Sequence, residues 1–150
     1  MSVPKALERL LRIRGVEEEQ RRRSLDTAVA KLKALEQARH AALQMEKQGR
    51  ARLSASVISG AIADRQAGLV ETEAAQRRAR MLAARIVAAE KETIARRQEF
   101  LEKRVERRQV ETLAEEAHAR EDLESGRRSQ RSIDDWYGAR RGRQGGGVRR

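Results

Sequence analysis

A long stretch of this chain contains almost nothing that would stop an α-helix. From Lys5 to about Glu124 the sequence has no proline and no cysteine, and its one aromatic residue is Phe100. Most of the other residues are Ala, Leu, Glu, Gln, Arg and Lys, which lose little conformational freedom in a helix. The stretch therefore predicts long helices.

Few bulky residues are available to fill a globular core. Aromatic residues make up 2% of the 150-residue chain, and 38% of its residues are charged. Alanine supplies much of the 39% hydrophobic content. A pocketed enzyme of this length would need larger interior side chains. The composition is typical of a coiled coil. The length of the chain is that of a single domain.

Apolar residues in the first part of the chain recur at the spacing of a heptad seam. The residues that share this register are Leu7, Leu11, Leu25, Ala28, Leu32 and Leu35. Arg14, Glu18 and Arg21 occupy the intervening seam positions. Because the next seam position is Arg39, we expect the stripe to drift to Leu43.

Two helical segments are separated by a stretch rich in serine and glycine. We predict a helix over about 5–53, a turn over about 54–68 and a helix over about 69–137. The second helix carries an apolar stripe of Val87, Ile94, Leu101, Val105, Val110, Leu113 and Ala117. Neither segment can bury its stripe alone, so the two should fold back on each other. The predicted fold is all-α, a long antiparallel two-helix coiled-coil hairpin that spans residues 1–138.

The end of the chain differs from the rest. Residues 126–150 hold eight arginines against Asp134 and Asp135, and so carry more than half of the chain's net charge of +11. They also contain the only tryptophan, Trp136, and the only tyrosine, Tyr137. We interpret this aromatic pair either as a cap on the hairpin or as a partner anchor. Residues 139–150, rich in Arg and Gly, are predicted to form a disordered basic tail.

The sequence offers little material for catalysis. It has no phosphate-binding loop and no dinucleotide fingerprint, and with no cysteine it has neither a thiol nucleophile nor a cysteine zinc site. Glu115, His118 and Asp122 share helical spacing and could hold a metal, but a solvated helix face is the simpler interpretation. We therefore predict no catalytic, cofactor-binding or metal site, and no enzyme.

The basic C-terminus admits a second hypothesis. Arginines attract phosphates, and Trp136 and Tyr137 could stack on bases, so the alternative is a basic helical nucleic-acid-binding protein. In the body of the chain acids and bases are interspersed, so we expect no continuous basic stripe there. No signal peptide and no membrane span are predicted, which favours a soluble cytoplasmic protein.

Both ends of the chain resemble one family. The opening KALERLLRIRGVEEEQRRRSLDTAVAKLKALE and the ending RRSQRSIDDWYGARR resemble the flagellar export protein FliJ and its injectisome counterparts, the stalk proteins of type III secretion. The resemblance covers most of the chain, and it does not distinguish a flagellar from an injectisome system.

This resemblance implies an antiparallel coiled coil similar to the rotor stalk of the F-type ATP synthase. It implies a place in the centre of the hexameric export ATPase, which hydrolyses the nucleotide, and a contact with the membrane gate protein that receives substrates. The protein would then be cytoplasmic and peripheral to the inner-membrane export apparatus.

The resemblance also suggests which residues bind partners. It implies that both termini lie at one end of the hairpin, where Leu7, Leu10, Leu11 and Arg14 would neighbour Ile133, Asp134, Asp135 and Trp136. We expect this combined end to face the ATPase. The charged residues Glu17, Glu18 and Arg21 are further candidates for contact with the ring or the gate protein.

Overall fold

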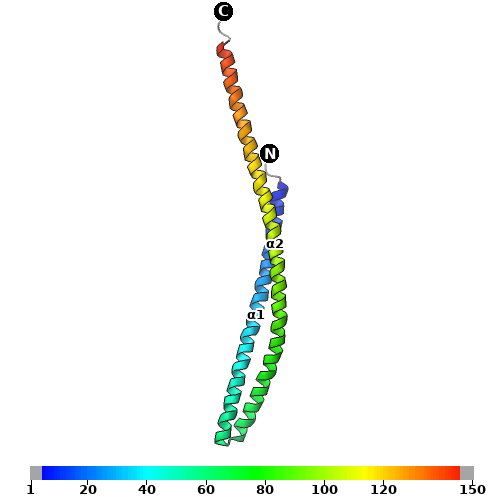
Figure 1. Ribbon diagram of the computed structural model, residues 1–150, viewed down its shortest axis with the longest axis vertical. Coiled ribbons are helices and arrows are strands. Elements are labelled where there is room, and N and C mark those ends of the chain that lie inside the picture. Colours follow the sequence, from blue (N-terminus) through cyan, green and yellow to red (C-terminus); the bar gives the residue numbers. More distant parts are fainter. Residues whose placement is uncertain (1–4, 146–150) are drawn as a thin grey trace, which may run out of the picture. The chain divides into compact units, whose positions relative to one another are not determined.

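Two long helices make up the part of the chain that the structure describes. A computed structural model describes residues 5–145, in which α1 spans Lys5–Ser59 and α2 spans Ile62–Gly145 (Figure 1). No strand occurs within these described residues. The predicted all-helical class with two long helices is therefore confirmed.

The chain divides into two compact units, and each contains a part of both helices. The hairpin unit comprises Glu18–Lys103, and the terminal unit comprises the residues up to Glu17 together with those from Arg104 onward. Within the hairpin unit α1 and α2 lie side by side and antiparallel (Figure 1). Ion pairs of Arg21 with Glu99 and of Arg52 with Glu71 join the two helices there.

The turn between the helices is much shorter than the predicted 54–68. Gly60 adopts a left-handed backbone with φ of 72°, and its N–H donates to the carbonyl oxygen of Ser56 at 2.9 Å. This is a glycine C-cap, which ends a helix and reverses the chain in one or two residues. Only Gly60 and Ala61 separate α1 from α2.

Serines and glycines on either side of this turn belong to the helices. The hydroxyl of Ser54 donates to the carbonyl oxygen of Arg50 at 3.2 Å, and that of Ser56 to the carbonyl oxygen of Leu53 at 2.7 Å. Such bonds to the preceding turn satisfy the hydroxyl without breaking the helix. Ser56 is also almost fully buried, so it serves the seam between the helices as a small residue.

Small residues dominate the seam of the hairpin unit. At strict seven-residue intervals α1 places Ala28, Leu35, Ala42, Gly49 and Ser56 toward α2. The buried residues of α2 follow the same heptad pattern: Gly68, Thr72, Ala75, Ala79, Leu82, Ile86 and Ala89. The heptad seam that we predicted from Leu25 to Leu35 thus continues to the turn without drifting.

Larger apolar residues that we assigned to the seam lie outside it. Ala42 is 1% exposed whereas Leu43 is 38% exposed, so the expected drift to Leu43 was wrong. The predicted stripe of Val87, Ile94 and Leu101 is likewise exposed. Each of these positions is one residue away from a buried or half-buried seam position, namely Ala42, Ile86, Thr93 or Phe100. At Ala42 and Thr93 the closely packed helices bury the smaller side chain and leave its larger neighbour exposed.

The helices approach closely at Gly49 and Gly68. A methyl group placed on Gly49 would come within 2.5 Å of the Thr72 hydroxyl oxygen and 3.0 Å of the Thr72 backbone nitrogen. One placed on Gly68 would come within 3.0 Å of the Gly49 carbonyl oxygen. Only glycine permits such a close backbone contact. Gly68 therefore belongs to the packing and not to a loop.

In the terminal unit α1 covers only part of α2. Arg14 forms an ion pair with Glu106 at 2.7 Å, and the buried residues of α2 in this unit include Val110 and Ala114. The antiparallel register of that ion pair places Leu11 and Leu7 of α1, both half-buried, opposite these two residues. The prediction that Leu7 and Leu11 belong to the seam agrees with this register.

Beyond this paired region α2 continues as a helix to Gly145. Every side chain from residue 122 to residue 143 is exposed. We call this segment, residues 122–143, the overhang. Residues 139–145, which we predicted to be disordered, are helical, because Ala and Arg between the glycines are good helix formers. Residues 146–150 lie outside the described part, so the predicted disorder of the tail remains a prediction there.

Candidate partner-binding surfaces

Local side-chain contacts support the overhang as a helix. Arg128 forms an ion pair with Glu124 at 3.4 Å, and the Gln130 amide donates to a carboxylate oxygen of Asp134 at 3.1 Å. Both contacts span four residues, and each adds only about 0.2–0.5 kcal/mol to a helix. These contacts do not replace the burial that a partner helix supplies in the rest of α2.

One face of the overhang carries an aromatic cluster. The rings of Trp136 and Tyr137 are 5.0 Å apart at 81°, and the guanidinium of Arg140 lies 5.3 Å from the Trp136 ring centre. Ile133 precedes Trp136 by three residues and Tyr137 by four, so it lies on the same side of the helix. Trp136 is 56% exposed. An exposed Trp beside Tyr and Arg has the composition of an interface hot spot.

The two groups of predicted partner-binding residues do not meet. Arg14 pairs with Glu106, which precedes Ile133 by 27 residues, or about 40 Å along a helix. Leu7 and Leu11 are half-buried and Leu10 is exposed, and the register of the Arg14–Glu106 pair places Leu7 near Ala114, far from Trp136. Ile133, Asp134, Asp135 and Trp136 all lie on the exposed overhang. The expectation that the two groups are neighbours was therefore wrong.

Most of the predicted charged contacts are engaged within the chain. The Arg14 guanidinium donates to Glu17 at 2.8 Å and to Glu106 at 2.7 Å. The hydrogen bond to Glu17, together with the two nearby carboxylates, raises the pKa of Arg14. Arg21 donates to Glu99 at 3.0 Å, and Glu18 is half-buried. The contacts of Arg14 with Glu106 and of Arg21 with Glu99 join the two helices.

The turn exposes a small apolar surface that the sequence analysis did not assign to a partner. Val57, Ile58 and Ile62 flank Gly60, and all three are exposed, Ile58 to 90%. Three large aliphatic side chains around a tight turn are unusual when nothing covers them. The signal in the sequence is their position beside a glycine C-cap, away from the heptad seam. We call this the tip surface.

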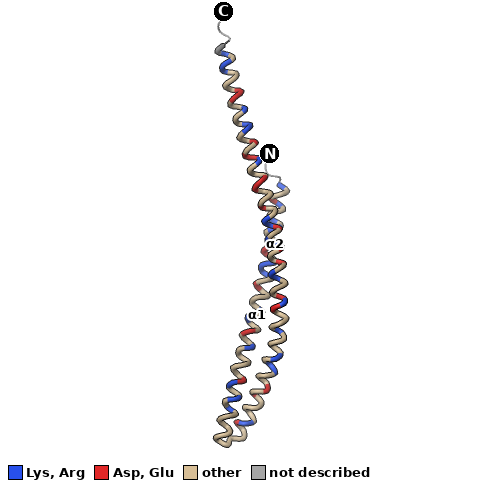
Figure 2. The backbone as a smooth tube through the Cα atoms, viewed as in Figure 1, with Lys and Arg blue, Asp and Glu red and all other residues tan. Residues whose placement is uncertain are grey.

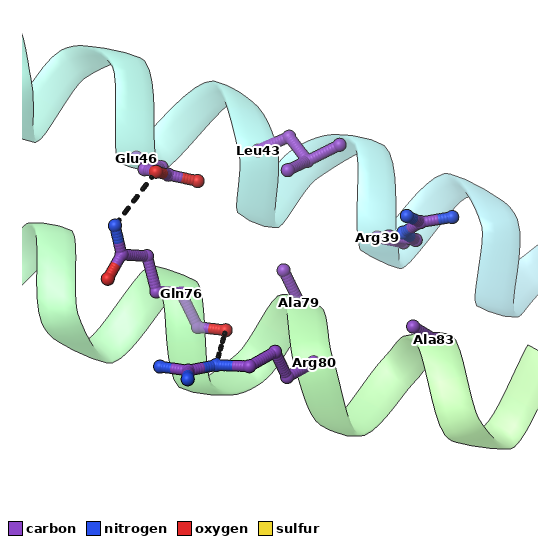
Figure 3. A pocket seen from close by; sticks show the side chains of 7 residues that line it. All are labelled: Arg39, Leu43, Glu46, Gln76, Ala79, Arg80 and Ala83. Atoms are coloured by element: carbon purple, nitrogen blue, oxygen red, sulfur yellow. Dashed lines mark hydrogen bonds between the residues drawn. The ribbon is translucent and has the colours of Figure 1, made fainter.

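A groove between the helices holds a single carboxylate. It has a volume of about 400 Å³ and is lined by Arg39, Leu43, Glu46, Gln76, Ala79, Arg80 and Ala83 (Figure 3). The Gln76 amide donates to Glu46 at 3.0 Å. This hydrogen bond, helped by the nearby positive charge of Arg50, lowers the pKa of Glu46. An ionised glutamate held in this way stabilises the helix pair and is a poor proton donor.

Neither a metal centre nor a membrane span emerges from residues 5–145. No group of three His, Asp or Glu side chains in this range lies close enough to hold a metal ion, and this includes Glu115, His118 and Asp122. No helix in the same range is long and apolar enough to cross a membrane.

Comparison with known proteins identifies one family. The family described as flagellar FliJ protein matches residues 4–146, which is nearly the whole chain. The curated proteins gave no match, and the solved structures gave none either. The matched range includes both helices, the tip surface and the overhang with its aromatic cluster. This chain therefore belongs to the flagellar FliJ protein family.

Proposed function

We propose that this flagellar export-related protein is the non-enzymatic central stalk of the hexameric export ATPase, and that it couples the ATPase ring to the export gate protein. The observation that carries the proposal is the overhang. Its side chains from residue 122 to residue 143 are all exposed, and one face bears Ile133, Trp136 and Tyr137. We propose that this helix enters the ATPase ring.

The energetics of a single helix support a docked role. An exposed helix lacks the main source of helical stability in proteins, which is the packing of an apolar face against a neighbour. Gly126, Gly138 and Gly142 lower the propensity of the overhang further. Insertion into a ring would bury the aromatic cluster and supply the missing packing. The overhang is then a segment that becomes fully ordered when it binds.

A single stalk inside six identical subunits would break their symmetry. Subunits that contact different faces of the helix receive different interaction energies, which biases the interfaces that close on nucleotide. Ile133, Trp136 and Tyr137 lie on one side of the overhang, whereas Arg131 and Asp135 lie on the opposite side. Such unequal faces are what this coupling requires.

We assign the contact with the gate protein to the tip surface. Val57, Ile58 and Ile62 are aliphatic and exposed, and they belong to the hairpin unit, whereas the overhang belongs to the terminal unit. Two binding surfaces in separate units allow one chain to engage two partners. The working place of the protein would be the cytoplasmic side of the inner-membrane export apparatus.

The experiment compares stimulation of the purified export ATPase by variants of the overhang. We expect Trp136→Ala to raise the concentration needed for half-maximal stimulation by about thirtyfold, since loss of a hot-spot residue costs about 2 kcal/mol or more. The matched control is Leu123→Ala, an equally exposed apolar residue of the same segment, which should leave that concentration unchanged. Because Trp136 is the only tryptophan, 5-fluorotryptophan gives a single ¹⁹F resonance that should shift when the ATPase is added.

Two results would contradict the proposal. One is half-maximal ATPase stimulation by Trp136→Ala at the same concentration as the original protein, and the other is an unchanged ¹⁹F resonance at saturating ATPase. The gate contact is tested separately by binding of the gate protein's cytoplasmic part to Ile58→Asp, which should be weakened while ATPase stimulation is preserved. The nucleic-acid alternative is not favoured by the family match.

A further inference from the structure

A ladder of ion pairs joins one side of α1 to α2 in the hairpin unit. Lys31 pairs with Glu92 at 3.0 Å, and Arg52 pairs with Glu71 at 3.2 Å. The residue numbers of each pair add to 123, and the pairs are three heptads apart on both helices. The ladder therefore has two intermediate positions, one heptad and two heptads from each end.

At both intermediate positions α1 has no acidic residue to pair with the arginine of α2. The register of the ladder places Ala38 opposite Arg85 and Met45 opposite Arg78. Within the described residues no carboxylate lies within 4.0 Å of either arginine. A hairpin built for stability alone would carry Glu on α1 at these two places, as α2 carries Glu at the two ends. The arginines are thus left available to an external carboxylate.

The unmatched arginines belong to a stretch of α2 without acids. Residues 74–89 contain four arginines and no Asp or Glu (Figure 2). This stretch extends about 24 Å along the helix. Contrary to our expectation of interspersed charge, the hairpin unit therefore carries a local basic surface.

Apolar side chains accompany these arginines. A shallow groove of about 510 Å³ is lined by Ala74, Arg77, Arg78, Met81, Leu82 and Arg85. Met81 is 63% exposed, and Met45 of α1 is also exposed. Methionine is flexible and polarisable, and it suits surfaces that adapt to a partner's side chains. We call Met45, Arg77, Arg78, Met81 and Arg85 together the arginine–methionine patch.

We propose that the arginine–methionine patch binds an acidic amphipathic helix of a partner protein. Carboxylates of that helix would pair with Arg77, Arg78 and Arg85, and its apolar side chains would contact the two methionines. The helix would lie along the outer side of the hairpin unit as a third strand of the coiled coil. This inference does not depend on the stalk function, because the patch includes no part of the overhang or the tip surface.

The boundaries of the patch favour a short acidic helix over a nucleic acid. Glu71 and Glu73 precede the acid-free stretch, and Glu90 and Glu92 follow it. Glu71 and Glu92 are compensated by their ion pairs, but Glu73 and Glu90 would repel a polyanion that continued along the hairpin. A partner helix of about four turns fits between these two carboxylates. The patch also lacks the aromatic side chains on which single-stranded bases stack.

The test measures binding of a fluorescein-labelled peptide of about 14 residues, with Glu and Leu on one helical face, to the full-length protein. We expect saturable binding that weakens with salt. Replacing Arg77, Arg78 and Arg85 with Gln should weaken it about tenfold. The matched control replaces Arg127, Arg131 and Arg141 of the overhang with Gln, which removes the same charge and should leave the affinity unchanged.

Further probes decide between partner classes. A peptide with Lys in place of Glu should not bind. For a 20-nucleotide single strand and for vesicles of anionic phospholipid, the affinity of the patch variant should equal that of the original protein. Equal peptide affinity in the patch variant, or equal losses in both triple variants, would overturn the proposal. The proposal would also be overturned if the oligonucleotide or the vesicles bound more tightly than the peptide and the patch substitutions abolished that binding. None of these outcomes depends on the export ATPase.

Discussion

Replacing Gly49 with alanine tests the close contact between the helices at Gly49 and Gly68. The added methyl group would lie 2.5 Å from the Thr72 hydroxyl oxygen, 3.0 Å from the Thr72 nitrogen and 3.2 Å from the Gly68 carbonyl oxygen. Two of these atoms are backbone. The hydroxyl cannot rotate away freely, because it donates to the Gly68 carbonyl oxygen at 2.7 Å. The helices must therefore separate locally.

Two opposing terms set the size of the effect. Overpacking of a tight contact costs about 1–3 kcal/mol, while replacing glycine by alanine inside a helix gains about 1 kcal/mol. We expect Gly49→Ala to lower the free energy of unfolding by about 1 kcal/mol in net terms. For a chain of this length that corresponds to a melting temperature about 2–4 °C lower.

Gly15→Ala is the matched control, because a methyl group there meets no atom within 4 Å. It keeps only the favourable helix term, so its melting temperature should rise by about 2–4 °C. Circular dichroism at 222 nm measures both variants. If Gly49→Ala melts at or above the temperature of Gly15→Ala, the close contact does not constrain the helices as argued here.

The double substitution of Gly49 and Gly68 sharpens the same test. A methyl group on Gly68 would also contact α1 backbone, at 3.0 Å from the Gly49 carbonyl oxygen and 3.1 Å from the Leu53 nitrogen. Once the helices have separated for the first methyl group, the second should cost less. We therefore expect the double variant to be less destabilised than the two single variants combined.

Three further predictions concern the turn, the acid response and the overhang. Gly60→Ala should destabilise the protein by about 1 kcal/mol, seen in thermal melting, because its φ of 72° disfavours any side chain. The hydrogen bond from Lys31 lowers the pKa of Glu92 below its ordinary 4.5, so the stability it gives is present above that pH and is lost as the pH falls through the lower folded value. Between about pH 5 and about pH 3 the melting temperature of Glu92→Gln should fall less than that of the original protein. Removing residues 126–150 should leave the melting temperature of the hairpin unchanged, since no side chain from residue 126 to residue 143 is buried.

The sequence predicted the helices well because that prediction rests on propensity and on the absence of breakers. The α1 seam was predictable as far as Leu35, where leucines mark it. Beyond that point the buried positions are Ala42, Gly49 and Ser56. Glycine and serine have low helix propensity and therefore predict a turn, whereas between two closely packed helices they are the small residues that allow contact. Only the facing helix distinguishes the two roles.

The register of α2 was not predictable for a related reason. Two apolar stripes run along it, one through Leu82, Ile86 and Ala89 and the other through Val87 and Ile94. Both have helical spacing, and both contain large apolar side chains. Burial went to the first, because its alanines match the small residues of α1. Which stripe is buried depends on how well the two helix surfaces fit each other, and this fit cannot be predicted from the periodicity of one helix alone.

The position of the turn explains why the predicted partner-binding residues separate. A turn at Gly60 and Ala61 places residues of α1 and α2 opposite each other when their numbers add to about 120, as in the pair of Arg14 with Glu106. The first described residue of α1, Lys5, then faces a position near residue 115, and everything later in α2 must extend past it. The expected contact of Leu7 with Trp136 came from the resemblance of the two chain ends to one family. The length of α2 after the turn made that contact impossible, and it left the aromatic cluster on the exposed overhang.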